Sequence, residues 1–154
     1  MIFDLQKQPR HIATLAAWHH QEWSHLNPSS TLQTRITKMQ HDYLSAEPVP
    51  KMFIWVDREK VIGSSAIVPC DMDSKPELKP WLASVFVKPD CRQLGIGTAL
   101  VKQVMAYARE QGFAELFLFT PDQESFYQKL GWHTVANESY HGEEVTVMRV
   151  DLIE

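Results

Sequence analysis

Residues 92–98, which read Arg-Gln-Leu-Gly-Ile-Gly-Thr, have the residue types and spacing that most clearly suggest chemistry. Gly95 and Gly97 allow a tight bend that brings several backbone N–H groups to one point. A helical pattern follows at once, and the first turn of a helix adds unpaired N–H groups and the positive end of the helix dipole. The segment therefore predicts a binding site for an anion such as a diphosphate.

Two other phosphate-binding motifs do not fit the same residues. A P-loop carries Lys and then Ser or Thr directly after its last glycine, and no such pair follows Gly97. A dinucleotide-binding fingerprint has three glycines in G-x-G-x-x-G spacing, and only G-x-G is present here. Both classes are excluded for this segment.

The wider pattern V-x-P-x-x-R-x-x-G-x-G-x-x-L, from Val87 to Leu100, resembles the acyl-CoA-binding signature of the GNAT superfamily of N-acetyltransferases. A second run at residues 126–132, Phe-Tyr-Gln-Lys-Leu-Gly-Trp, resembles the F-Y-x-K-x-G-F/W element of that family. The likeness is specific over residues 81–132 and covers the remainder only through the order of elements. The shorter patterns W-x-x-S-V-x-V and T-x-D-Q-x-x-F-Y are similar to the branch that holds the actin N-terminal acetyltransferase.

The resemblance implies acetyl-CoA as the acetyl donor, a co-substrate, with no metal. The pantetheine arm would enter a gap between two splayed parallel strands, 81–87 and 114–119, as an added strand does. Arg92 could pair with a phosphate of CoA or be a solvated loop charge. The candidate cofactor-binding residues are Val85, Phe86, Val87, Arg92, Gln93, Leu94, Gly95, Ile96, Gly97, Thr98 and Thr120.

Two of these positions depart from the family pattern. Gln93 stands where many relatives carry Gly, so we expect a slightly stiffer loop that still binds through its backbone. Thr120 stands where many relatives carry Asn, and its hydroxyl can still form a hydrogen bond.

Tyr127 is the candidate catalytic residue, a role that the family likeness assigns to it. Amide formation from a thioester expels a thiolate, which a phenol can hydrogen-bond or protonate. The alternative is that Tyr127 simply packs beside Phe126.

The general base stays unassigned at this point. The strand at 81–87, where some relatives carry Glu, contains no carboxylate. The remaining candidates are Glu22, His133, His141, Glu143 and ordered water, and none stands out. No Cys or Ser lies in an evident nucleophile arrangement, so we expect direct transfer in a ternary complex.

Length, composition and charge limit which other classes of protein the chain could belong to. The 154 residues suit one domain, 1–154, and 44% hydrophobic with 22% charged residues is typical of a soluble protein. A net charge of −4 disfavours broad nucleic-acid binding. We see no signal peptide and no apolar run near the roughly 18 residues of a membrane span. Cys70 and Cys91 fit neither a disulfide framework nor a zinc site, so we expect a cytoplasmic protein.

The histidines give no metal pattern. His19, His20 and His25 lie close in sequence, but no carboxylate or cysteine joins them at a ligand spacing. We therefore expect solvent-facing or core-edge histidines and no metal.

Hydrophobic periodicity and turn residues outline the elements that position these groups. A buried stripe is expected along the first helix, and Gly112 is expected to end the third. We expect strands at 2–6, 52–56, 61–68, 81–87, 114–119, 133–139 and 144–152, and helices at 9–26, from Ser29 or Ser30 to about Tyr43, at 98–111 and at 122–130. A polar loop is expected at 71–79. With the resemblance, this order implies the α/β GNAT fold, a mixed central sheet with splayed strands and helices on both faces.

The expected function is an N-acetyltransferase acting on a primary amine, which could be a small molecule or a peptide N-terminus. Two alternatives stay open: an enzyme for polyamines or antibiotic-type amines, and a CoA-binding sensor that does not turn over. Partners are expected to exclude nucleic acid and membrane, and the assembly to be a monomer or homodimer.

Overall fold

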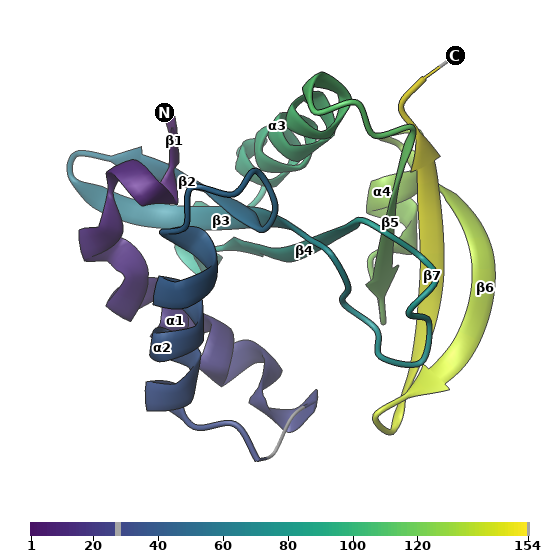
Figure 1. Ribbon diagram of the computed structural model, residues 1–154, viewed down its shortest axis with the longest axis horizontal. Helices are drawn as coiled ribbons and strands as arrows, with labels where there is room; N and C mark the ends of the chain where they lie inside the picture. The colour runs from purple at the N-terminus through teal and green to yellow at the C-terminus, as the bar shows by residue number, and fades with distance from the viewer. Residues whose placement is uncertain (27–28, 154) are drawn as a thin grey trace.

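Helices and strands follow one another in the predicted order, β-α-α-β-β-β-α-β-α-β-β, which confirms that prediction. A computed structural model describes residues 1–26 and 29–153 (Figure 1). The strands are β1 (Ile2–Asp4), β2 (Lys51–Asp57), β3 (Lys60–Val68), β4 (Trp81–Val87), β5 (Glu115–Thr120), β6 (His133–Tyr140) and β7 (Glu143–Asp151). The α-helices are α1 (Ile12–Trp23), α2 (Leu32–Tyr43), α3 (Ile96–Glu110) and α4 (Glu124–Gln128).

The strands form one mixed sheet in the order β1-β2-β3-β4-β5-β7-β6. β4 and β5 are parallel, and each other neighbouring pair is antiparallel. Because a parallel connection needs a crossover, α3 carries the chain from β4 to β5. The mixed sheet predicted from the sequence is confirmed.

Two-residue turns connect β2 to β3 and β6 to β7. Arg58 and Glu59 have φ values of 50° and 67° between β2 and β3, and His141 and Gly142 have 49° and 82° between β6 and β7. Positive φ at both central residues gives a turn whose twist matches that of the strands it joins.

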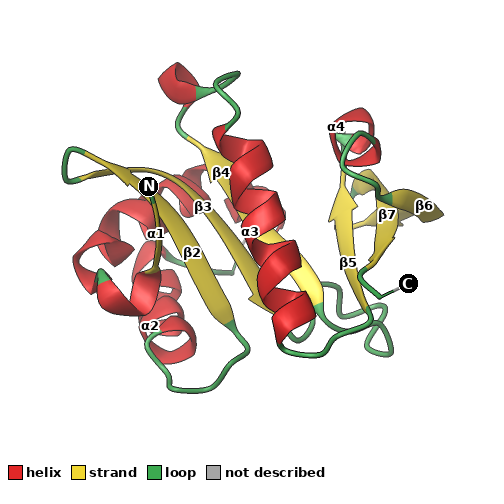
Figure 2. Ribbon diagram, turned by 90° about the horizontal axis from the view of Figure 1, so that it is seen from above, coloured by secondary structure: helices red, strands yellow, loops and turns green. Residues whose placement is uncertain are grey.

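Helices cover both faces of the first half of the sheet (Figure 2). Helices α1 and α2 pack on one face, where Leu15 and Met39 meet Ile54 and other alternate residues of β2 and β3. Helix α3 packs on the opposite face, where Val104 meets Leu82. The predicted stripe of α1, Ile12, Leu15, Ala16 and His19, is buried as expected.

Some boundaries differ from the prediction. The N-cap of α2 is Thr31, since its side chain and that of Thr34 exchange hydrogen bonds with each other's backbone N–H. Helix α3 begins at Ile96, two residues earlier than expected, because Gly95 adopts a left-handed conformation directly before it. The loop expected to be polar contains the fully buried Met72.

In the part of the chain that the structure describes, no helix combines the length and apolar character needed to cross a bilayer.

Candidate active site

Strands β4 and β5 are adjacent in the sheet but pair at one position, where Trp81 lies opposite Phe117. Beyond this point the two strands separate toward their carboxyl ends, with α3 in front of the opening (Figure 2). Separation leaves one side of β4 without a β5 partner over the rest of its length. The splayed pair inferred from the family resemblance is therefore present.

A bulge interrupts β4 inside this opening. Ser84 and Val85 both face the single residue Ser65 of β3, and Ser84 has a φ of 54°. An extra residue shifts the alternation of the strand and re-aims its side chains. Consequently Ala83 lies on the α2 face of the sheet, whereas Val85 packs on the α3 face.

A buried hydrogen-bond chain holds the bulge. The Ser64 hydroxyl donates to the Ser84 carbonyl at 2.7 Å and lies 2.9 Å from Nε2 of His19. Since the single Ser64 proton is used toward Ser84, Nε2 of His19 must carry the hydrogen that completes the chain. Burial lowers the pKa of His19 to about 3, so this imidazole stays neutral. His19 is therefore a core residue, and through Ser64 it supports the bulge of β4.

The register of β3 with β4 decides which amides face the opening. The Lys88 N–H donates to the Ile62 carbonyl of β3 at 2.8 Å. Residues of an antiparallel ladder alternate in direction, so the Val87 amide turns away from β3 and the Phe86 amide turns toward it. The Val87 carbonyl accordingly accepts from Nε of Arg92 at 2.8 Å. Of the three β4 residues predicted to bind the cofactor, Val87 therefore turns its backbone amide into the opening, whereas the backbone amide of Phe86 is directed toward β3.

The Phe86 side chain has a different neighbourhood. Its ring lies 5.5 Å from that of Trp18 and 6.2 Å from that of Trp23, both on α1. The guanidinium of Arg92 sits 5.7 Å from the centre of the same ring. Arg92 is thus positioned by Phe86 and Val87, and the residue is exposed at the start of the glycine loop.

The glycine loop has the tight bend that the predicted anion site requires. Gly95 has a φ of 82°, and Gln93, where many relatives carry Gly, adopts a φ of 65°. The first helical bond runs from the Ala99 N–H to the Gly95 carbonyl at 3.1 Å. The N–H groups of residues 96–98 therefore precede the hydrogen-bond ladder of α3 and are free to face an anion.

Side chains of this loop fall into two groups. Leu94 is exposed, and Ile96 is buried in the core, so neither side chain contacts an anion at the helix start. Gly97 faces Val87 of β4 and Phe126 of α4, because a Cβ on it would lie 3.6 and 3.8 Å from them. Gly97 therefore lies at the opening between β4 and α4.

Gly63 of β3 is a site-forming residue that the sequence reasoning missed. A Cβ at this position would lie 2.9 Å from the Phe86 carbonyl oxygen and 2.9 Å from the Leu100 side chain. Only Gly lets β3, β4 and α3 meet this closely. A glycine inside the predicted strand at 61–68 was the available signal.

Tyr127 lies on α4, which follows the carboxyl end of β5 and neighbours the glycine loop through Phe126 and Gly97. Its ring packs edge-on against Phe126 and Trp132, and its hydroxyl has no hydrogen-bond partner among residues 1–26 and 29–153. Burial, with a smaller contribution from Asp122, raises the pKa of the Tyr127 phenol. The group therefore stays protonated at neutral pH, the state that a proton or hydrogen-bond donor needs.

Thr120 closes the turn before α4. Its hydroxyl accepts a hydrogen bond from the Gln123 N–H at 3.0 Å, and its side chain is buried. The oxygen of this hydroxyl is thus engaged at the end of β5, while its hydrogen stays available to donate.

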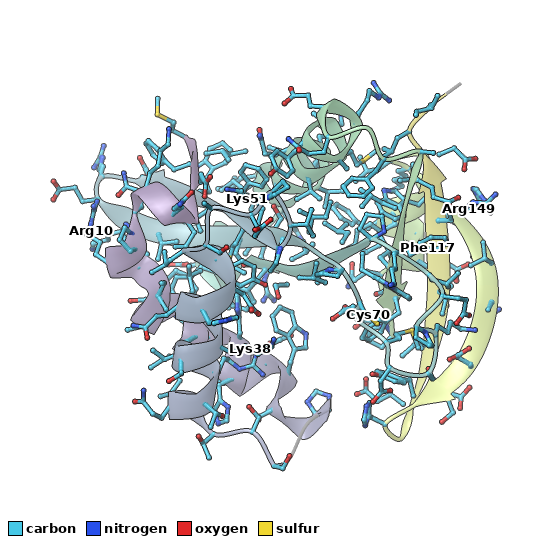
Figure 3. The ribbon with its side chains drawn as sticks, in the orientation of Figure 1. Arg10, Lys38, Lys51, Cys70, Phe117 and Arg149 are labelled. Atoms are coloured by element: carbon cyan, nitrogen blue, oxygen red, sulfur yellow. The ribbon has the colours of Figure 1, made fainter. Side chains whose placement is uncertain are left out.

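A cavity of about 460 Å³ lies on the other face of β4, under α2. Figure 3 labels one residue from each of two walls, Lys38 on α2 and Cys70 on the loop after β3. Ser84 of the bulge and Tyr43 of α2 also line it. Since Ser84 belongs to both features, the cavity reaches the strand that borders the opening.

The carboxylate that the sequence did not single out is Asp71, in the loop after β3. It lines the cavity and is half-buried, and burial raises its pKa to about 7. By contrast, the four residues considered as bases from sequence, Glu22, His133, His141 and Glu143, do not line the cavity. The signal available in the sequence was Met72, an apolar residue in a mostly polar loop. Its burial in the structure shows that this loop folds back onto the protein.

No group of three or more His, Cys, Asp or Glu side chains in the described ranges is arranged to hold a metal ion.

Comparison with known proteins identifies the family. The model of the acetyltransferase (GNAT) family matches residues 12–132, and the chain belongs to that family. Human N-acetyltransferase 8 is 32% identical over 106 residues, which cover 66% of this chain and 46% of that protein. Human N-acetyltransferase 8B is 30% identical over 114 residues, which cover 71% and 50%. The chain spans about half the length of these two relatives.

Solved structures share the fold across the whole chain. An aminoglycoside 6'-acetyltransferase type Ii superposes with a TM-score of 0.76 at 18% identity, covering 100% of this chain and 98% of the other. An aminoglycoside 6'-N-acetyltransferase complexed with coenzyme A gives 0.75 at 16%, covering 100% and 98%. A ribosomal-protein-alanine N-acetyltransferase from Brucella melitensis gives 0.74 at 15%, covering 98% and 99%. The α/β GNAT fold expected from the sequence is confirmed.

Proposed function

We propose that this protein transfers an acetyl group from acetyl-CoA directly to a primary amine. One observation carries the proposal: three features lie together at the carboxyl ends of β4 and β5. These are the opening between the two strands, the glycine loop before α3, and Tyr127 on α4. Family membership and a fold neighbour complexed with coenzyme A support the same donor.

Each feature has a part in binding the donor. The free N–H groups at residues 96–98 would hold the diphosphate, with the Arg92 guanidinium beside them. The pantetheine amides would lie along β4 and pair with the backbone of Val87, which faces the opening. This arrangement would bring the thioester to the bulge at Ser84, beside the cavity.

The chemistry then needs a neutral amine and a departing thiolate. The amine nitrogen attacks the thioester carbonyl carbon, a C–N bond forms and the C–S bond breaks. Tyr127, protonated at neutral pH, donates a hydrogen bond or its proton to the sulfur. Fold neighbours include enzymes named for aminoglycosides and for a ribosomal-protein alanine, so both small-molecule and peptide amines belong in the test.

Release of CoA thiol from acetyl-CoA across a panel of aminoglycosides, polyamines, amino acids and short peptides tests the proposal. We expect amine-dependent thiol release together with an acetylated product detected by mass spectrometry. Tight CoA binding without thiol release from any amine would instead favour a CoA-binding sensor.

A further inference from the structure

The cavity under α2 contains two opposite charges that are left unpaired. Arg35 of α2 and Asp71 of the loop after β3 both line it, and neither forms an ion pair with any described residue. Burying a charge without a partner is costly. Two such groups facing one cavity therefore indicate a ligand that carries both charges.

Arg35 is the cationic group of the pair. Its Nε is buried and has no hydrogen-bond partner among residues 1–26 and 29–153, and burial lowers the pKa of the guanidinium. Lys38 lines the same cavity, but its ammonium already lies 2.9 Å from the Asp42 carboxylate. An anion entering the cavity would therefore find its unsatisfied donor at Arg35.

Asp71 is the anionic group. Its carboxyl lies near the Tyr43 and Tyr140 phenols, whose pKa values it helps to raise. No hydrogen bond to the Asp71 carboxyl occurs within the described part of the chain. The Tyr43 phenol also interacts electrostatically with Arg35 and contacts the Ser84 side chain. Tyr43 therefore lies between the two charged groups and the bulge of β4.

We propose that this cavity is the acceptor site and takes a primary amine that carries a carboxylate or similar anion, with Arg35 binding the anion and Asp71 binding the ammonium and taking its proton. The inference rests on the proposed acetyl transfer and deepens it. Ser84 lines the cavity, so an amine held there is next to the strand that would present the thioester.

The proton balance closes with the residues present. The Asp71 carboxylate takes one proton from the ammonium, and the neutral amine attacks the thioester carbon. The second nitrogen proton reaches the CoA sulfur, by way of Tyr127, as the C–S bond breaks. The products are the amide, CoA thiol and protonated Asp71, which releases its proton to water.

Asp71 is placed to titrate near neutrality, and several titratable groups surround it. The groups facing the cavity are Arg35, Lys38, Asp42 and Tyr43 from α2, His19 from α1 and Cys70 beside Asp71, with Tyr140 of β6 close by. Burial keeps His19 neutral and Tyr43 protonated, and hydrogen bonds from Lys38 and His41 lower the pKa of Asp42. The Asp71 pKa of about 7 therefore predicts activity that rises with pH through neutrality.

The test compares matched amines. One arm uses leucine against leucinamide, and a second uses the C-terminally amidated peptides Asp-Ala-Ala and Asn-Ala-Ala. We expect kcat/KM at least about tenfold higher for the carboxylate member of one pair, as loss of a charged hydrogen bond implies. The pair that shows the preference distinguishes a free amino acid from a peptide as the source of the anion.

The Arg35→Gln variant should raise KM for the carboxylate amine and abolish this preference. Lys38→Gln, on the same helix but already paired with Asp42, is the matched control and should keep the preference. Asp71→Asn should lower kcat for every amine by about 10²–10⁴-fold and remove the inflection near pH 7.

Three outcomes would overturn the inference: equal use of carboxylate and carboxamide amines by the wild type, a preference that survives Arg35→Gln, or an Asp71→Asn variant with unaltered turnover and pH profile. Calorimetric binding of the same amines, with and without CoA, gives a readout that does not depend on turnover. If the panel gives no thiol release but carboxylate amines bind through Arg35, the proposed acetyl transfer fails, and the cavity remains a binding site for such amines and not an acceptor site.

Discussion

Single residues acquire their chemistry here from what surrounds them. Tyr127 packs between Phe126 and Trp132, yet its hydroxyl has no partner within the described residues. A phenol fixed in this way loses little entropy when it meets a departing sulfur. Packing and catalysis are therefore compatible at this position.

Tyr127→Phe tests the catalytic role because it removes only the O–H and leaves the ring to pack. We expect turnover to fall by about 10²–10⁴-fold, with acetyl-CoA affinity little changed. The fall will be smaller if Tyr127 only hydrogen-bonds a thiolate that leaves unprotonated. Single-turnover kinetics on an acceptor for which chemistry is rate-limiting provide the measurement, and unaltered turnover would return Tyr127 to the core.

Asp71→Asn should change stability in a pH-dependent direction. Burial raises the pKa of Asp71 to about 7, so its proton is held more tightly in the folded state than in the unfolded chain. The charged carboxyl therefore destabilises the fold progressively as pH rises from about 4 to 7, and fully above that. At pH 8 the melting temperature of the Asn variant should equal or exceed that of the wild type. At pH 4 it should not exceed the wild-type value. A large loss of melting temperature at pH 8 would contradict the burial argument.

At the scale of elements, the site depends on where strands stop pairing and how closely they approach a helix. The bulge at Ser84 turns Ala83 to the cavity and Val85 to the α3 face, so one strand serves both sides of the sheet. Gly63 lets α3 lie close enough to β3 and β4 for its first turn to border the opening.

Gly63→Ala should destabilise the fold by roughly 1–3 kcal/mol, the range for an overpacked core, because one of the two 2.9 Å contacts is a backbone oxygen that moves with difficulty. Gly97→Ala is the control, since a Cβ there makes contacts of 3.6 and 3.8 Å and its φ is not in the left-handed region. Urea denaturation of both variants measures the difference. Equal free energies of unfolding for the two variants would show that β3 and α3 can move apart at little cost.

Gly97→Asp tests the anion site with the same control. The substitution places a negative charge at the start of α3, facing Val87 and Phe126, where the diphosphate is expected to approach. Calorimetry should detect no CoA binding to this variant, while Gly97→Ala retains more affinity. Wild-type affinity in a correctly folded Asp variant would refute the assignment.

For the whole molecule, the donor is expected to be anchored mainly by its charge. In the proposed site, the N–H groups ahead of α3 and the adjacent Arg92 would contact the diphosphate end of the ligand, whereas the pantetheine arm would gain only strand-like pairing with one side of β4. Binding energy should therefore be distributed unevenly along the ligand.

Thermal shift with CoA and with pantetheine, which lacks the diphosphate, measures this distribution. A ligand at about 100 times its Kd stabilises a protein by roughly 2.7 kcal/mol. CoA should raise Tm clearly, and pantetheine at the same concentration should raise it much less. Equal shifts from the two ligands would place the anchor in the arm instead.

Local patterns in the sequence determined much of the molecule. The glycine loop, the two hairpin turns and the order of the elements depend on residues close in the chain, where backbone preferences act directly. The paired motifs around Gly95 and Tyr127 sufficed to indicate the family. Even the departure at Gln93 fits, since its backbone adopts the left-handed φ that Gly would favour.

Only the tertiary structure decided the rest, because the remaining features join residues distant in sequence. The single pairing position of β4 with β5, the bulge braced by His19 and the turn of the Phe86 amide toward β3 follow from strand register. Arg35 and Asp71 are 36 positions apart in the chain and share a cavity only after α2 packs on the sheet. Register and packing are collective properties of many distant contacts, so no local pattern encodes them.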